Sequence, residues 1–366
     1  MSVESIYFLD IANKINLFAT IPIICIGLIG NTLSLIIYSQ SKYRLNSSNV
    51  FILILSITDS LFLIIHFFED TINLLEQYYN IEINYLNIID INKESCKIAN
   101  YLRYVLRSIS SFIILAFTIQ RYIIVYSPLS SKRFKTKRYA WYTCLITIIS
   151  SFIINLWSLF MFDLSNENKK CDIINEWINV YYYISICYFT LTKLLPMLII
   201  VILNCLIIHI SKKDDLKRDQ YRNINMTNLI DSNTRRNAIK NVNQIINKNK
   251  TINSTSKMSK TLALASFSFV ILNLPYVIMW YYFNYLLFIF ITINIYYKLY
   301  LLRLIYFTTA ELHETENSTD NNFFAYVQLA EIFYILSYSI NFYLYCLSST
   351  LFRKQLFSSN NNLVVI

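Results

Sequence analysis

The chain has 366 residues and a net charge of +10, with 55% hydrophobic but only 15% charged residues. Soluble proteins usually carry about 25% charged residues, and a soluble fold of this length needs more turn-forming residues than two Gly and four Pro. The composition therefore disfavours a soluble protein. The positive charge does not indicate nucleic-acid binding either, because Lys and Arg alternate with long apolar runs.

Seven apolar runs are long enough to cross a bilayer, since about 20 helical residues span its hydrocarbon core. They are predicted at 16–40, 49–75, 97–126, 139–163, 179–211, 258–283 and 322–347. Helices are expected because lipid requires every backbone polar group to be paired internally, and the runs lack the alternation of barrel strands. The predicted fold class is an all-α membrane protein, a seven-transmembrane helix bundle with residues 16–347 as its body.

Lys and Arg gather in the loops after the first, third and fifth runs and in the tail. This asymmetry predicts an N-terminus outside the cell, since basic loops stay in the cytoplasm. Residues 1–15 are then an extracellular N-terminus, and residues 212–257 are a polar third cytoplasmic loop. Residues 348–366 form a cytoplasmic tail, in which 352–357 have the pattern of a short amphipathic surface helix.

The segment 284–310 is strongly apolar, although only a short loop is expected between the last two spans. An eighth span here would invert the final helix. Three interpretations stay open: an extension of the sixth helix, a re-entrant or surface-lying segment, or sequence translated from an unspliced intron.

Short motifs follow one another through the spans. They are Gly30-Asn31, the lone carboxylate Asp59, Cys96 placed 25 residues before Arg121, Gln120-Arg121-Tyr122, Pro196, Pro275, and Asn341 through Tyr345. Each motif alone is weak, but their order and spacing over residues 25 to 354 resemble the rhodopsin-like G-protein-coupled receptors. The family's Asp-Arg-Tyr has Gln120 in its first position here, and its Asn-Pro-x-x-Tyr has Phe342 in place of proline.

Two details narrow the resemblance. Asn273 stands where many members have Trp, and Phe342 replaces the usual proline. Both are similar to invertebrate neuropeptide receptors of the FMRFamide type. Arg103 occupies the position at which amine receptors carry an aspartate, which disfavours a biogenic amine as the ligand.

The resemblance implies roles for individual residues. A disulfide would join Cys96 to Cys171 outside the cell, and Asp59, Ser110 and Asn341 would form a hydrated site that can hold sodium. Phe269 and Pro275 would mark the bend at which the sixth helix swings outward, because proline removes a helix hydrogen bond. That motion would expose Arg121 and Tyr345 to a G protein, and Gln120, Tyr122 and Asn341 are the other predicted coupling and switch residues. The sequon at Asn317 is the one placed outside, which predicts glycosylation there.

Helical spacing predicts a charged pocket in the outer half of the bundle. Arg103 precedes Arg121 by five helical turns, so both point the same way, and Arg107 lies one turn deeper. Asp70 follows Asp59 by about three turns.

Glu69 adjoins Asp70, and Glu331 lies near the face of Tyr345 on the last span. Two interpretations remain: these acids pair with a basic peptide ligand, with Asn273 also in the pocket, or they pair with Arg103 and Arg107 in an internal network.

The predicted function is a plasma-membrane receptor for an extracellular, RFamide-like neuropeptide that signals through a heterotrimeric G protein. Membrane lipid is the other expected partner, nucleic acid is not expected, and no cofactor besides sodium is implied. No metal cluster, Gly-rich phosphate loop or nucleophile elbow is visible, which argues against an enzyme. A chemosensory receptor of the same fold is the nearer alternative. A transporter or channel would predict internal repeats and broken midplane helices.

Overall fold

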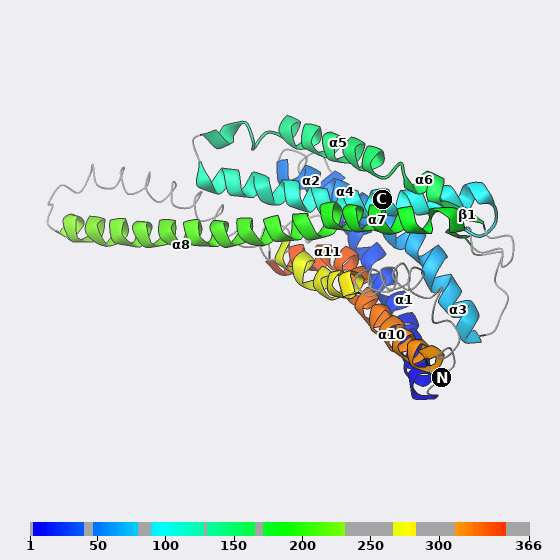
Figure 1. Ribbon diagram of the computed structural model, residues 1–366. Coiled ribbons are helices and arrows are strands. Elements are labelled where there is room, and N and C mark those ends of the chain that lie inside the picture. The colour runs from blue at the N-terminus through cyan, green and yellow to red at the C-terminus, as the bar shows by residue number, and fades with distance from the viewer. Residues whose placement is uncertain are drawn as a thin grey trace, which may run out of the picture.

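The computed structural model describes residues 3–39, 47–79, 89–127, 130–164, 171–230, 266–282 and 312–348 (Figure 1). A helix is present at each of the seven predicted spans within these ranges. The predicted segment 284–310, residues 231–257 of the predicted third loop, and all but the first residue of the predicted tail lie outside the described residues. The predicted all-α membrane helix bundle is confirmed.

Several of the spans consist of more than one helical segment. In chain order the helices are α1 (Val3–Ser39); α2 (Ser47–His66) with the π-helix η1 (Phe67–Thr71) and α3 (Ile72–Tyr79); α4 (Lys93–Tyr126); α5 (Lys137–Ile154) with α6 (Ser158–Met161); α7 (Ile178–Phe189) with the π-helix η4 (Thr190–Leu194) and α8 (Leu195–Ile230); Ser266–Tyr282; and α10 (Leu312–Ser339) with α11 (Asn341–Ser348). Two single 3₁₀ turns, η2 (Ser130–Lys132) and η3 (Asn175–Trp177), lie in the connections.

Five helical stretches of the described chain are long and apolar enough to cross a membrane: Glu4–Ser39, Ser47–Glu76, Lys93–Tyr126, Lys137–Met161 and Val180–Lys213. Their outward faces are apolar, as shown by Ile146 at 67% exposure and Ile29 at 60%. Their inward faces carry polar groups, including Asn31 and Asp59 at 0%. Apolar faces outside and polar groups inside suit a bundle whose solvent is lipid.

The first helix begins earlier than predicted. α1 starts at Val3, so residues 3–15 are helical, whereas the sequence placed the start of the span at 16. The extra turns pack along α10, where the rings of Phe8 and Tyr326 lie 5.4 Å apart and the Asn16 amide donates to Gln328. Figure 1 shows α1 and α10 side by side along this length. Tertiary packing, rather than hydropathy, sets where this helix starts.

The fifth span also continues beyond its predicted end. α8 runs to Ile230, so residues 212–230 are helical instead of forming the start of a polar loop. This stretch contains neither Gly nor Pro and is rich in Lys, Arg, Asp and Asn, so nothing in it breaks a helix. Figure 1 shows the end of α8 projecting well past the neighbouring helices.

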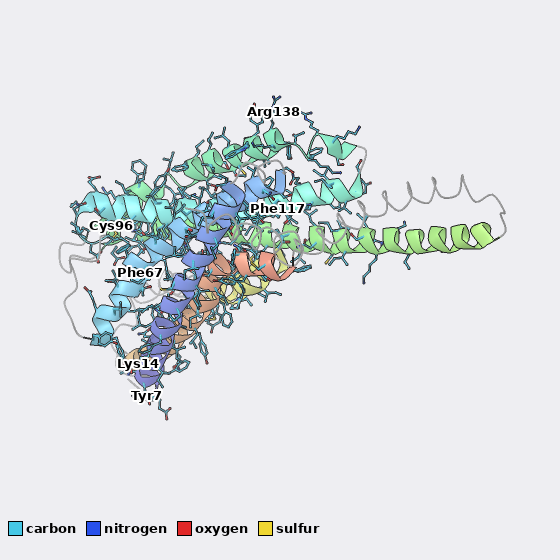
Figure 2. All side chains as sticks on the ribbon, turned by 180° about the vertical axis from the view of Figure 1, so that it is seen from behind. Tyr7, Lys14, Phe67, Cys96, Phe117 and Arg138 are labelled. Carbon is cyan, nitrogen blue, oxygen red and sulfur yellow. A yellow bond between two sulfur atoms is a disulfide. The ribbon has the colours of Figure 1, made fainter. Side chains whose placement is uncertain are left out.

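A disulfide holds a hairpin against α4. The strands β1 (Phe162–Leu164) and β2 (Cys171–Ile173) pair antiparallel with Leu164 opposite Cys171. Cys171 is bonded to Cys96, as the family resemblance implies, with the two Cα atoms 5.5 Å apart. The Cys171 backbone N–H also donates to Asp90 at 2.8 Å. Cys96 is labelled in Figure 2. We call the end of the bundle that holds this cysteine the disulfide end.

Candidate functional site

A cavity of about 210 Å³ opens inside the bundle, toward the disulfide end. Charged and aromatic side chains line it: Asp70, Arg103, Tyr104, Arg107, Tyr181, Ser185, Tyr188, Phe189, Lys193, Tyr276, Trp280, Glu331 and Tyr334. The structure therefore brings together four of the six residues predicted for ligand binding. Such a lining, largely aromatic with a few convergent charges, is typical of ligand sites.

The fifth predicted residue, Glu69, lies beside the cavity and forms an ion pair. Its carboxylate is 2.5 Å from the Arg103 guanidinium, and the Asp70 carboxylate is 3.7 Å from the same side chain. Arg103 also donates to Asn100 at 2.9 Å. Arg103 and Glu69 are 15% and 12% exposed, so little water screens the pair. The internal network that the sequence left as one of two interpretations is formed at Arg103.

Arg107 differs from Arg103 because it forms no ion pair within the described part of the chain. Its guanidinium lies over two aromatic rings, 5.4 Å from the centre of Phe62 and 5.3 Å from that of Tyr334. Cation–π contacts of this kind stabilise a desolvated cation by about 2 kcal/mol. Within the described residues Arg107 is thus a cation of the cavity lining without a bonded carboxylate.

Asn273, the sixth predicted ligand residue, does not line the cavity. It is fully buried, and its side-chain amide donates to the Phe269 carbonyl at 2.8 Å, one turn back in the same helix. The bond ties the Asn273 side chain to its own helix, two residues before Pro275. Its predicted role in ligand binding stays a prediction.

Lys193 is a cavity residue that sequence reasoning missed. It lies in η4, is 1% exposed, and donates to the Tyr338 hydroxyl at 3.0 Å. Its ammonium also lies 4.9 Å from the centre of the Tyr334 ring. The signal was present, because an ionisable residue inside an apolar span indicates a functional site, as it did for Asp59.

Asp59 has the neighbours that the sodium prediction requires. Its two carboxylate oxygens accept hydrogen bonds from Ser110 at 3.0 Å and Asn341 at 2.8 Å. The carboxylate of Asp59, the hydroxyl of Ser110 and the amide oxygen of Asn341 are oxygen ligands that suit a hard cation, so the three residues fit as its holders. Lys193, however, attracts the same carboxylate electrostatically and supplies a competing cation. Sodium binding stays a prediction.

The opposite end of the bundle holds the predicted signalling residues. Arg121 is 6% exposed, donates to the Ser48 hydroxyl and lies 5.2 Å from the centre of the Phe117 ring. Gln120 is fully buried and donates to the Phe134 carbonyl at 2.5 Å. Within the described residues Arg121 forms no ion pair with a carboxylate.

The remaining predicted switch and modification residues are placed as follows. Tyr122 stacks on Tyr126 with ring centres 5.6 Å apart. Phe269 is buried, with the Lys193 ammonium 5.5 Å from its ring centre. For Tyr345 and Asn317 only the backbone is described, in α11 and in the first half of α10 respectively.

Comparison with known proteins agrees with this architecture. Residues 30–309 match the model of the 7 transmembrane receptors of the rhodopsin family, which are receptors rather than enzymes. Over 159 residues the chain is 30% identical to cephalotocin receptor 1 of Octopus vulgaris, an alignment that covers 43% of this chain and 37% of that relative. The family match spans more than half of the chain and includes Asp59, Cys96 and Arg121. The chain therefore belongs to the rhodopsin family of seven-transmembrane receptors.

Proposed function

We propose that the protein is a plasma-membrane receptor for a neuropeptide, with a heterotrimeric G protein as its intracellular partner. The observation that carries the proposal is the cavity at the disulfide end, where Arg107 and the carboxylates of Asp70 and Glu331 face one space. A peptide offers both charges and aromatic side chains to such a lining. The similar octopus protein is a cephalotocin receptor by name, which supports a peptide as the ligand class.

The finer proposal is an RFamide-like peptide. Such a ligand carries an arginine that pairs with a carboxylate and an aromatic ring that packs among Tyr276, Trp280 and Tyr334. The alternative peptide class, favoured by the octopus relative, is one similar to cephalotocin. A chemosensory ligand is the further alternative, which expression confined to sensory endings would favour.

Signalling is proposed to follow a shift between two packings of the bundle. Peptide binding would favour the packing in which the helix Ser266–Tyr282 swings outward about Pro275. Arg121 is enclosed in the present arrangement. An outward swing would open the space around it to the G protein.

The direct test is a calcium or cAMP response in transfected cells against a library of amidated neuropeptides that includes RFamide and cephalotocin-like peptides. We expect a sub-micromolar response to an RFamide peptide. A response to a cephalotocin-like peptide alone would contradict the RFamide assignment but retain the peptide class. Silence with confirmed surface expression would contradict the peptide class.

The acidic residues of the cavity give a sharper prediction. Glu331→Gln and Asp70→Asn are each expected to lower peptide potency by about tenfold or more, because a hydrogen bond to a charged group contributes about 1.5–3 kcal/mol. The concentration–response curve measures this at matched surface expression. Asp172→Asn, on the exposed strand β2, is the control and should leave potency unchanged. Unchanged potency in both cavity variants would show that neither acid anchors the ligand.

Peptide-independent signalling tests the effect of Gln120, which stands where the family's Asp-Arg-Tyr motif has aspartate. The Gln120 amide carries no charge and its NH₂ group donates to the Phe134 carbonyl, so it attracts the Arg121 guanidinium less strongly than the family's aspartate would. We expect Gln120→Asp to lower peptide-independent signalling, measured as GTPγS binding to membranes. Gln120→Asn, which keeps the amide, is the matched control. Equal basal binding in wild type and Gln120→Asp would refute this explanation.

A further inference from the structure

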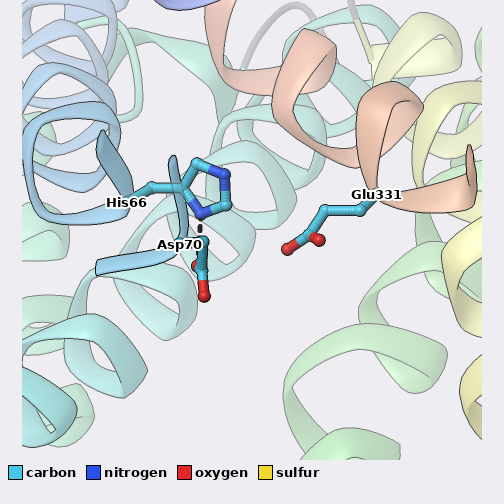
Figure 3. Close-up of side chains that lie close together, drawn as sticks. All are labelled: His66, Asp70 and Glu331. Carbon is cyan, nitrogen blue, oxygen red and sulfur yellow. Dashed lines mark ion pairs between the residues drawn. The ribbon is translucent and has the colours of Figure 1, made fainter. Parts of the chain in front are cut away.

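His66, Asp70 and Glu331 form a three-residue cluster at the edge of the cavity, which Asp70 and Glu331 line. His66 ends α2 and Asp70 lies one turn later in the π-helix η1, while Glu331 comes from α10. One nitrogen or oxygen atom from each residue lies within 4.8 Å of the other two. Figure 3 shows the imidazole and the Glu331 carboxylate directed toward one another, with Asp70 beside them.

The histidine has an unusual environment for a buried imidazole. It is 2% exposed, and its Nδ1 atom lies 2.7 Å from an Asp70 oxygen. The two residues form an ion pair one helical turn apart, and the Asp70 carboxylate is also 3.7 Å from Arg103. Glu331 forms no ion pair within the described residues, so it is the member of the cluster whose charge is least balanced.

Two carboxylates and one imidazole meet in the cluster, and three cations lie near it. Arg103 of α4 is 2.5 Å from Glu69 and 3.7 Å from Asp70. Arg107 of α4 lies over aromatic rings, and Lys193 of η4 donates to Tyr338. Within the described residues Glu331 forms no ion pair, so a cation added to the cluster would balance the charge of this carboxylate.

The donor set indicates which cation fits. Imidazole nitrogen and carboxylate oxygen are both ligands that Zn²⁺ accepts, and three protein ligands leave the fourth tetrahedral position open. Ligand atoms on a tetrahedral zinc ion lie about 3.4 Å apart, given bonds of about 2.1 Å. The three ligand atoms lie within 4.8 Å of one another, and the His66 and Asp70 atoms are 2.7 Å apart. These separations bracket the tetrahedral value, and ion binding would bring the atoms to it.

We propose that His66, Asp70 and Glu331 form a binding site for a divalent transition-metal ion, with Zn²⁺ as the expected ion. The fourth coordination position faces the cavity, because Asp70 and Glu331 both line it. A bound ion would neutralise the two carboxylates and tie the η1 turn to α10. Metal binding would thereby fix the geometry of the cavity from the side of α2.

The test uses the full-length receptor in lipid nanodiscs, freed of metal with a chelator, and the metal ion alone. Co²⁺ serves as the spectroscopic probe, and we expect the visible absorption of a tetrahedral site that one equivalent of Zn²⁺ abolishes. Thermal unfolding followed by tryptophan fluorescence should show a saturable rise in Tm with Zn²⁺. No peptide or G protein is involved, so the outcome is independent of the proposed function.

Substitutions of the cluster residues test which side chains bind the metal ion. His66→Gln and Glu331→Gln should each raise the Zn²⁺ concentration for half-maximal stabilisation by at least about tenfold, a loss seen even for outer-shell partners. His209→Gln, an exposed histidine of α8, is the matched control and should keep the wild-type response. If His66→Gln does not fold, Glu331→Gln and the cobalt spectrum decide. Absence of the cobalt band, or an unchanged Zn²⁺ response in Glu331→Gln, would overturn the proposal.

Discussion

Arg103→Gln is expected to lower the free energy of unfolding by about 3–5 kcal/mol, the loss typical when one partner of a buried ion pair is removed. The substitution leaves Glu69 as an uncompensated buried carboxylate, since its oxygen lies 2.5 Å from the guanidinium and both side chains are at most 15% exposed. Glu69→Gln should cost less, because Arg103 then still faces Asp70 at 3.7 Å. Arg103→Gln is thus expected to cost more than Glu69→Gln, because one arginine faces two carboxylates.

The double variant Glu69→Gln/Arg103→Gln measures the interaction free energy between the two side chains. It should be more stable than Arg103→Gln alone, because removing both charges abolishes the desolvation penalty of the survivor. Tm values of the purified receptor measure this. Lys93→Gln breaks an exposed pair with Asp163, whose atoms are 3.5 Å apart, and should change stability by at most about 1 kcal/mol. Equal losses in Arg103→Gln and Lys93→Gln would contradict the assignment of a buried pair.

The spans were predictable from sequence because lipid imposes one strong requirement, an apolar helix of sufficient length. The residues at which the helices begin and end could not be predicted from sequence. The hydropathy of residues 3–15 is interrupted by Asp10 and Lys14, yet these two pair with each other at 2.7 Å on the helix surface, while Ala12 packs inward. Hydropathy averages over both faces of a helix, so it cannot detect a helix that continues because one face packs against α10.

Charged residues inside the spans were only partly found. Asp59 was identified as the lone carboxylate of its span, and Asp70, Arg103 and Glu331 by helical spacing from motif positions. The structure places all four inside the bundle.

His66 and Lys193 were missed although the rule on intramembrane ionisable groups applies to both. His66 follows Asp59 by seven residues, about two helical turns, and precedes Asp70 by four, so helical spacing could have found it. Tyr338, the partner of Lys193, comes from the last span, and no local pattern in the sequence predicts that contact.

Gly27→Val is expected to be the most disruptive substitution on α1. An added Cβ at Gly27 would lie 2.7 Å from the Ser339 Cβ and 2.8 Å from the Leu63 Cδ1, which is closer than van der Waals contact permits. Glycine in a helix interior normally costs about 1 kcal/mol relative to alanine, so helix propensity alone predicts that losing Gly27 should stabilise the helix. Steric overpacking of about 1–3 kcal/mol or more opposes this gain and should exceed it for valine.

The two glycines of the chain provide a graded test of that competition. At Gly30 the nearest contact of an added Cβ is 3.0 Å, to the Phe342 Cβ, so Gly30→Ala should lie near the balance point with little change in Tm. Gly27→Val should lower both Tm and surface expression, while Cys25→Val, on the exposed face one half-turn earlier, should change neither. A wild-type Tm in Gly27→Val would mean that α1 does not approach α2 and α10 this closely. The close contacts predicted for an added Cβ at Gly27 and Gly30 would then not explain why glycine occupies these two positions.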